Sequence, residues 1–375
     1  MKQAQKDHGS IRPIRVVLIV FLVSTLVLAV FLCYLTYILP EEHGPEGRFF
    51  TITITVTYEN KNDATEAWNL TESDMTIGLF MNNSWQTVYL TNSSHAVKIF
   101  KTDGDGNTVA VMDFPTKIEP GGNFSYEVTY RVILRQASVP QIAEDNSGTL
   151  SDTPADLKNS YCRSEGTWQV NDSRLTGLAY EIAGNETKVL TILKKFIAWI
   201  HGNITYNSAE IPRYPNETLS ERRGDCDDQA NLLITFCRIV GIPAYLQIGC
   251  IYPPRGGVPT TATYWGGHLK DTLLNIGWHG WAMVFVPPWG WLPVDLTYVS
   301  GGLDNDPLNA IKSSAIITAP TVQYINITRT DYAGDSRNLR DFVMSHDFYI
   351  YEQDTMSEEN TERVTEISVP SSIRM

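Results

Sequence analysis

Cysteine is scarce in this sequence of 375 residues, which contains five. The five are Cys33, Cys162, Cys226, Cys237 and Cys250. No two of them form a C-x-x-C pair, and none stands beside a histidine at the spacing of zinc ligands. The sequence therefore predicts neither a metal site nor a bound cofactor.

Basic side chains are also few. The chain has 29 Lys and Arg against 42 Asp and Glu, which gives a formal net charge of -13. Phosphate backbones and anionic lipid surfaces repel a chain with this balance. The composition therefore argues against nucleic acid as a partner.

Beyond residue 39 the sequence has no apolar stretch as long as the one at residues 16–39. Residues 16–39 carry no charged side chain, and a helix that spans a bilayer needs about 20 residues. The run is longer than the apolar core of a signal peptide, which has about 7 to 15 residues. Residues 1–15 carry four basic side chains and one acidic side chain, which predicts a cytoplasmic N-terminus. We therefore expect a single transmembrane helix at 16–39, with the rest of the chain extracellular at the cell membrane.

Residues 47–135 have the pattern of an all-β region. Residues 51–58 and 125–132 alternate strictly between polar and apolar or aromatic side chains, as half-buried strands do, and Gly-rich turns separate the runs between them. The spacing predicts an immunoglobulin-like β-sandwich over 47–135. The polar stretch 136–160 is expected to be a linker, and the acidic stretch 352–375 a loose polar tail.

A helix is predicted directly after Cys226. Apolar residues recur there at helical spacing, namely Ala230, Leu233, Cys237 and Val240. Gly241 and the proline at 243 end the helix. Cys226 is therefore placed in or before the first turn, where free backbone N–H groups and the helix dipole favour a thiolate. A cysteine at a helix start is also often only a packing residue, so a catalytic role requires a base nearby.

A β-hairpin predicted downstream supplies that base and a carboxylate. Its first strand carries His279 and its second carries Asp295, on either side of a Pro/Gly turn. Together with Cys226 they have the chemistry of a nucleophile, a base and the group that orients the base. A three-residue loop at 288–290 would put Asp295 opposite Met283, on the same face of the strand as His279 but two same-face positions further along. The pattern thus predicts the correct face but no direct contact between His279 and Asp295.

These segments resemble the transglutaminase-like superfamily. Its pattern consists of a G-x-C-x-D helix start, a helix end R-x-x-G-I-P-A, an H-x-W strand and a G-W-x-P-x-D strand. The same motifs stand here in the same order at 224–228, 238–244, 279–281 and 290–295. The resemblance covers about residues 160–300 and implies an α+β fold with a papain-like transglutaminase core over 161–350, in which Cys226, His279 and Asp295 are catalytic. The Gly-rich stretch 253–276 is expected to be a flap over the site.

Two functions remain open from the sequence. The first is a membrane-anchored extracellular cysteine enzyme that acts on amide bonds of a protein or peptide substrate through a thioester acyl-enzyme. Water as the acyl acceptor would make it a peptidase or amidase, and an amine would make it a transglutaminase. The alternative is a catalytically inactive transglutaminase-fold binding module at the cell surface. The sequence predicts no oligomeric state.

Overall fold

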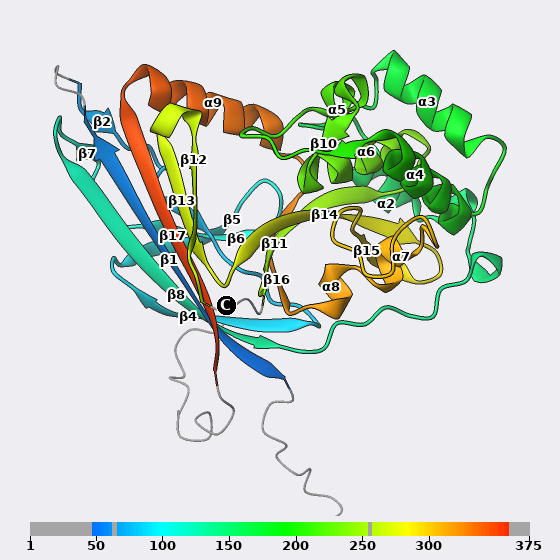
Figure 1. Cartoon of the computed structure of the whole chain (residues 1–375), viewed down its shortest axis with the longest axis horizontal. Helices are drawn as coiled ribbons and strands as arrows, with labels where there is room; N and C mark the ends of the chain where they lie inside the picture. Colours follow the sequence, from blue (N-terminus) through cyan, green and yellow to red (C-terminus); the bar gives the residue numbers. More distant parts are fainter. Residues whose placement is uncertain (1–46, 62–65, 254–256, 360–375) are drawn as a thin grey trace, which may run out of the picture. The chain divides into compact units, whose positions relative to one another are not determined.

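The longest strands of the protein belong to one six-stranded sheet (Figure 1). The computed structural model describes residues 47–61, 66–253 and 257–359. The strands of this sheet, in spatial order, are β12 (Thr260–Tyr264), β13 (Leu269–Leu274), β17 (Phe348–Glu359), β1 (Arg48–Asn60), β8 (Asn123–Leu134) and β4 (Gln86–Ser93).

Strand β1 lies inside this sheet because it pairs along both of its edges. Thr53 stands opposite Thr129 of β8 on one side and opposite Thr355 of β17 on the other, and both pairings are antiparallel. Side chains at alternate positions of β1 are buried, including Phe50, Ile52, Ile54 and Val56. The strands predicted at 51–58 and 125–132 are therefore confirmed, with the period of two that a half-buried sheet requires.

Two strands of the six-stranded sheet come from a part of the sequence where no strand was expected. Residues 260–264 and 269–274 form β12 and β13, and β13 pairs in parallel with β17, so the predicted flap at 253–276 was wrong. Strand β17 continues to Glu359, so the first part of the predicted tail at 352–375 is a strand. An immunoglobulin-like sandwich confined to 47–135 is not confirmed, because β1 takes β17 as a partner from about 300 residues further along the chain.

A second sheet has the order β15-β14-β11-β16 and carries the candidate site. Its strands are β11 (Ala244–Ile251), β14 (Gly277–Val286), β15 (Gly290–Val294) and β16 (Thr321–Ile327). The smaller strands are β2 (Trp68–Asn69) with β7 (Lys117–Ile118), β3 (Thr76–Gly78) with β6 (Thr108–Met112) and β5 (Val97–Thr102), and β9 (Thr205–Tyr206) with β10 (Arg223–Gly224).

Helices pack against the second sheet and form the main apolar core with it (Figure 1). The described helices are α2 (Ala155–Tyr161), α3 (Ser173–Ala183), α4 (Val189–Asn203), α5 (Pro215–Glu221), α6 (Cys226–Ile239), α7 (Asn309–Lys312), α8 (Ala315–Thr318) and α9 (Tyr332–Ser345), with short 3-10 turns η1 (Glu144–Asn146), η2 (Leu150–Asp152) and η3 (Trp265–Gly267). Helix α9 differs from the others in packing against β17 of the six-stranded sheet. Leu233 and Phe236 of α6 are fully buried against Phe196 of α4 and other core residues. The helix predicted after Cys226 is confirmed.

The stretch predicted as a linker, 136–160, is ordered along the core. It contains η1, η2 and α2, and Gly148 donates its N–H to the carbonyl of Pro287 at 2.7 Å. The Ser147 hydroxyl accepts a hydrogen bond from the N–H of Leu190 in the first turn of α4. These contacts tie the connection to both the helices and the hairpin turn.

The predicted transmembrane segment, 16–39, lies outside the residues that the structure describes, as do the cytoplasmic stretch 1–15 and the end of the polar tail. In the described part of the chain, no helix has the length and apolar character needed to cross a membrane.

Candidate active site

Helix α6 begins at Cys226, which is half-buried. Asp225 is the residue before the helix, and it forms a reciprocal capping box with Asp228, in which each side chain accepts a hydrogen bond from the other residue's backbone N–H. This capping satisfies donors of the first turn that would otherwise lack partners. The sequence D-C-D-D therefore holds Cys226 as the first helical residue.

Gly280 lets the start of α6 approach strand β14 closely. A Cβ atom built on Gly280 would lie 2.9 Å from the Cβ of Asp227, a distance that packed side chains do not adopt. Only glycine allows this contact between helix and strand without a shift of one of them. Because Gly280 follows His279 directly, the contact brings the base strand beside the nucleophile helix.

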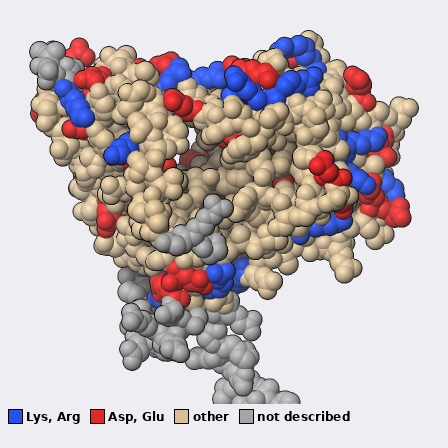
Figure 2. All heavy atoms as spheres, in the orientation of Figure 1, with Lys and Arg blue, Asp and Glu red and all other residues tan. Residues whose placement is uncertain are grey.

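Cys226 and His279 line the same cavity, which has a volume of about 310 Å³. Its other lining residues are Tyr206, Ile251, Pro253, Gly277, Trp278, Thr297 and Tyr298. None of these is a Lys, Arg, Asp or Glu. Figure 2 shows that charged side chains gather over the helices along the upper edge of that view, while the hollow beside the six-stranded sheet is surrounded mostly by other residues.

His279 is held by Asp295. The Nε2–H of His279 donates to Oδ2 of Asp295 at 2.8 Å, and the two side chains are 9% and 1% exposed. The other carboxylate oxygen, Oδ1, accepts the backbone N–H groups of Thr297 at 3.0 Å and of Tyr298 at 3.2 Å. With Nε2 protonated by this contact, Nδ1 is the basic nitrogen of the neutral ring.

The direct contact between His279 and Asp295 corrects the register that the sequence predicts. Val286 pairs with Gly290, so the loop is 287–289, and Met283 stands opposite Pro293 instead of Asp295. Proline has no N–H to donate to a ladder, so both prolines after Val286 stay in the turn, and the pairing begins one residue earlier on each strand than a 288–290 loop would give. Asp295 is thereby moved one step closer to His279 along the same face.

Electrostatics favour the thiol form of Cys226. Burial raises the pKa of Cys226 well above its usual value, Asp227 raises it further, and a hydrogen bond with the Gly280 backbone lowers it. The thiolate expected from the helix dipole alone is therefore not the resting form, because burial outweighs the dipole. Nucleophilic attack from this cysteine requires a base that takes the proton.

Three carboxyl groups at the start of α6 lie close together. The side-chain oxygens of Asp225, Asp227 and Asp228 can all be within 4.8 Å of one another. Burial, with the charges of its two acidic neighbours, raises the pKa of Asp227 well above its usual value. Burial and Asp225 raise the pKa of Asp228 to about 6, and Arg213 opposes this shift. Both oxygens of Asp228 are engaged by Arg213, through its N–H at 2.6 Å and its Nη1 at 2.8 Å. The cluster thus caps helix α6 and binds Arg213.

Residues 176–296 match the family model of the transglutaminase-like superfamily. This segment is therefore transglutaminase-like in sequence. Thirteen chains of solved structures match the protein significantly. One is a crystal structure from Cytophaga hutchinsonii of a protein proposed to be a cysteine protease, with 18% identity over 84% of this chain and 90% of that one and a TM-score of 0.49. Another, from Parabacteroides distasonis, is a protein proposed to be a protease, with 11% identity over 60% of this chain and 63% of that one and a TM-score of 0.23. No curated protein matches the chain significantly.

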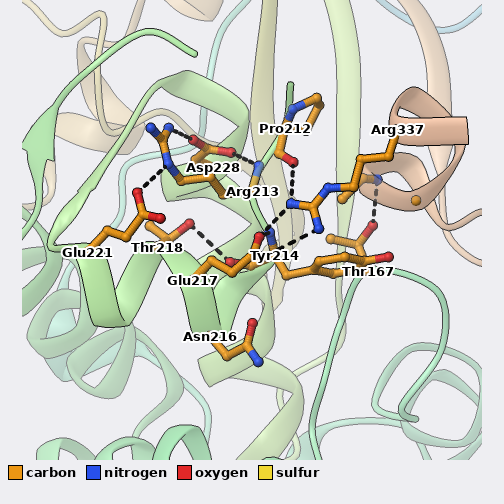
Figure 3. Close-up of polar contacts among 12 residues, drawn as sticks. Thr167, Pro212, Arg213, Tyr214, Asn216, Glu217, Thr218, Glu221, Asp228 and Arg337 are labelled. Carbon is orange, nitrogen blue, oxygen red and sulfur yellow. Dashed lines mark hydrogen bonds and ion pairs between the residues drawn. The ribbon is translucent and has the colours of Figure 1, made fainter. Parts of the chain in front are cut away.

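In this transglutaminase-like core, a polar network fixes the segment before the cysteine helix (Figure 3). Arg213 binds Asp228 of α6 and also Glu221 at the end of α5, at 3.1 Å. Arg337 of α9 binds Glu217 of α5 at 2.6 Å. Sequence reasoning missed both arginines, because an isolated arginine gives no sign of a partner 15 or 120 residues away.

Removal of Arg213 tests this network. Arg213→Ala is expected to lower the free energy of unfolding by about 3 kcal/mol, because it leaves the fully buried Asp228 carboxyl without its side-chain partner. Arg223→Ala is the control, since Arg223 pairs with the same Glu221 but its side chain is 53% exposed; its effect should be below about 1 kcal/mol. Urea denaturation of both variants measures the difference, and equal effects would contradict the anchoring role.

Sequence reasoning also missed two tyrosines at the candidate site of this core. Tyr206 and Tyr298 line the cavity and are 59% and 49% exposed. Of the tryptophans near His279, Trp278 lines the cavity and Trp281 is fully buried in the core. Large exposed aromatics beside a candidate nucleophile are a signal for substrate contact, but exposure can be judged only in the folded chain.

Proposed function

We propose that the protein is a cysteine enzyme that breaks amide bonds through a thioester formed on Cys226. The observation that carries the proposal is the position of His279. It lines the same cavity as Cys226 and hydrogen bonds to the buried Asp295 at 2.8 Å. A base held by a carboxylate beside a cysteine at a helix start is the arrangement needed for nucleophilic acyl transfer.

In the first half-reaction, Nδ1 of His279 accepts the thiol proton as Sγ of Cys226 attacks the amide carbonyl carbon. The backbone N–H of Cys226, in the first turn of α6, is suited to donate to the oxyanion that forms. His279 then gives the proton to the leaving amine, and the C–N bond breaks to leave a thioester. Asp295 stabilises the protonated ring between these two proton transfers.

The second half-reaction decides the class of enzyme. Attack of water on the thioester carbon, with His279 as base, gives a carboxylic acid and the free thiol, which is hydrolysis. Attack of a primary amine gives a new amide, which is transamidation. A peptide is the proposed substrate, because Tyr206, Tyr298 and Trp278 offer aromatic surfaces for its side chains beside the reacting thiol.

Thiol labelling tests the proposal against the binding-module alternative. We expect iodoacetamide to modify Cys226 in the native full-length chain ahead of Cys237 and Cys250, which are both fully buried. Cys162 is the matched control, because it is half-buried like Cys226 but lies away from His279, and burial raises its pKa to about 11. His279→Ala should remove the preference for Cys226. Equal labelling of Cys162 and Cys226 that His279→Ala does not change would support a module without chemistry.

We propose further that the enzyme is anchored in the cell membrane by residues 16–39, with its folded part outside. The support is the uncharged run at 16–39 and the excess of basic residues before it. Protease added to intact cells is expected to digest the folded part and leave residues 1–15 protected. Survival of the folded part until the cells are lysed would reverse the orientation.

A further inference from the structure

A second cavity, of about 380 Å³, lies between the inner face of the six-stranded sheet and the β14/β11/β16 strands. It is lined by Ile54, Val56, Thr76, Ile77, Gly78, Tyr126, Val128, Tyr130, Ile248, Trp278, Tyr324, Tyr332 and Glu352. Trp278 also lines the cavity of Cys226. We call this second cavity the tyrosine cavity. It shares the lining residue Trp278 with the candidate active site.

Glu352 lines the tyrosine cavity, and two further carboxyl groups lie beside it on the inner face of the sheet. Along β17, the inward positions 348, 350, 354 and 356 are buried and 352 is partly buried, so Glu352 and Asp354 face the interior together. On the neighbouring strand β13, Asp271 stands in register with Glu352. Three acidic side chains therefore meet on a sheet face that is otherwise apolar or aromatic.

One carboxylate oxygen of Asp354 accepts no hydrogen bond from another described residue. The residue is 0% exposed, and its Oδ2 accepts the indole N–H of Trp278 at 2.6 Å. Among residues 47–61, 66–253 and 257–359, no group hydrogen bonds to its other oxygen, Oδ1. Glu352 and Asp354 also hydrogen bond to each other, but a buried pair of carboxyl groups without a basic partner is costly.

Burial and the neighbouring carboxyl groups disfavour the ionised forms of Glu352 and Asp354. Burial raises the pKa of Glu352 to about 8, and Asp354 and Asp271 raise it as well. Burial likewise raises the pKa of Asp354 to about 7. In the described part of the chain, no Lys, Arg or His forms an ion pair with either carboxyl. A cation that entered the cavity would favour their ionised forms.

Aromatic rings supply the rest of the lining. Tyr126 and Tyr130 come from β8, Tyr324 from β16 and Tyr332 from α9, and the Tyr324 ring packs against Trp278 with centroids 5.2 Å apart. Ammonium groups bind to aromatic faces through the ring quadrupole, most strongly where water is excluded. Tyrosines and a tryptophan around a carboxyl pair are the combination that suits an organic ammonium ion.

We propose that the tyrosine cavity is a binding site for an alkylammonium group, which pairs with Glu352 and Asp354 and lies among the rings of Tyr126, Tyr324 and Trp278. An ammonium ion has three donors, which match the oxygens of the two carboxyl groups. Because Trp278 contacts both cavities and donates to Asp354, occupancy of this site acts on the wall of the cavity of Cys226. The binding proposal does not depend on the chemistry proposed for Cys226.

Calorimetric titration of the full-length chain with butylammonium chloride, without any acyl donor, tests the site. We expect saturable binding at pH 8.5 and none with 1-butanol, which is similar in shape but neutral. Glu352→Gln should weaken binding by about tenfold or more, since it removes a charged partner in a desolvated place. Glu358→Gln, on the same strand but paired with Arg48 at the surface, is the matched control and should bind normally.

The affinity should also fall as pH is lowered from 8.5 to 6, because protonation of the carboxyl pair competes with the ammonium ion. The other titratable groups that face the pair are Asp271 of β13, Tyr58 of β1, Tyr126 of β8, Cys250 of β11 and Tyr324 of β16. Of these, only Asp271, with its pKa raised to about 6 by burial, titrates in this range, and it acts in the same direction.

A ring variant keeps the test valid if the carboxyl variants fail to fold. Tyr126→Phe retains the ring and should retain binding, whereas Tyr126→Leu should weaken it, with circular dichroism as the check on folding. Lack of saturable butylammonium binding at pH 8.5, equal affinity in Glu352→Gln, or equal binding of 1-butanol would overturn the proposal.

A kinetic comparison distinguishes the two sources of the ammonium group. If it belongs to the substrate, a peptide with lysine should have a lower KM than the same peptide with norleucine, and Glu352→Gln should remove the difference. If it is a free amine, butylammonium should change the turnover of both peptides alike. Either result supports the site, and the calorimetric titration still decides the proposal if no peptide is turned over.

Discussion

Cys226→Ala is expected to abolish acyl transfer while leaving the fold intact. The Sγ atom of Cys226 is the only cysteine sulfur on the cavity that His279 lines, within the part of the chain that the structure describes. Without it no thioester can form, and a hydroxyl in its place, as in Cys226→Ser, is a much weaker nucleophile at neutral pH. The half-buried position means that loss of the sulfur removes little packing.

Hydrolysis of a peptide amide and incorporation of a primary amine, measured side by side on the same protein, check this expectation. The wild-type result also shows which acceptor takes the acyl group. Cys162→Ala is the matched control, because Cys162 is equally half-buried but does not line the cavity, and it should retain full turnover. Undiminished turnover in Cys226→Ala would remove this cysteine from the mechanism.

Asp295→Asn has the second largest expected effect. The carboxylate accepts the Nε2–H of His279 and so leaves Nδ1 free to act as a base. An amide at this position can instead donate to Nε2, which favours the ring tautomer with the proton on Nδ1. In a related serine triad, the same exchange lowers kcat by about 10⁴-fold. We expect a loss of that order, with a small change in stability, since an asparagine oxygen can still accept the N–H groups of Thr297 and Tyr298.

The surface offers a matched control for this variant. His201 binds Asp304 through Nε2 at 3.0 Å, in the same geometry as His279 and Asp295, but the Asp304 side chain is 92% exposed. Asp304→Asn should leave turnover unchanged. If Asp295→Asn kept wild-type turnover with a normal pH profile, Asp295 would be only a strand-end residue that satisfies nearby N–H groups, and a dyad of Cys226 and His279 would remain.

Local sequence was sufficient to predict the elements that bear the candidate site. The period of apolar residues, the acidic N-cap and Gly241 define α6 from its own residues, and the assignment to the transglutaminase-like superfamily is confirmed over 176–296. Alternation along 51–58 likewise defines β1. Each of these patterns depends on neighbours within one turn or one strand, so no distant partner is needed to recognise it. The catalytic roles of Cys226, His279 and Asp295 remain predictions.

Three features were decided only by the tertiary structure, because each depends on which strands pair and in which register. The first is the register of β14 against β15, which brings His279 into contact with Asp295. A loop at 288–290 would have kept the two side chains apart. The acidic composition of residues 352–359 suggests a tail, but these residues form part of β17 and pair with β1. Backbone hydrogen bonds hold a strand partner whatever its side chains are. That same pairing placed Glu352 at the tyrosine cavity, with Asp354 beside it on the same strand. The sequence by itself determined the helix after Cys226, strands such as β1 and β8, and the candidate catalytic residues, whereas burial and strand pairing determined which polar groups meet.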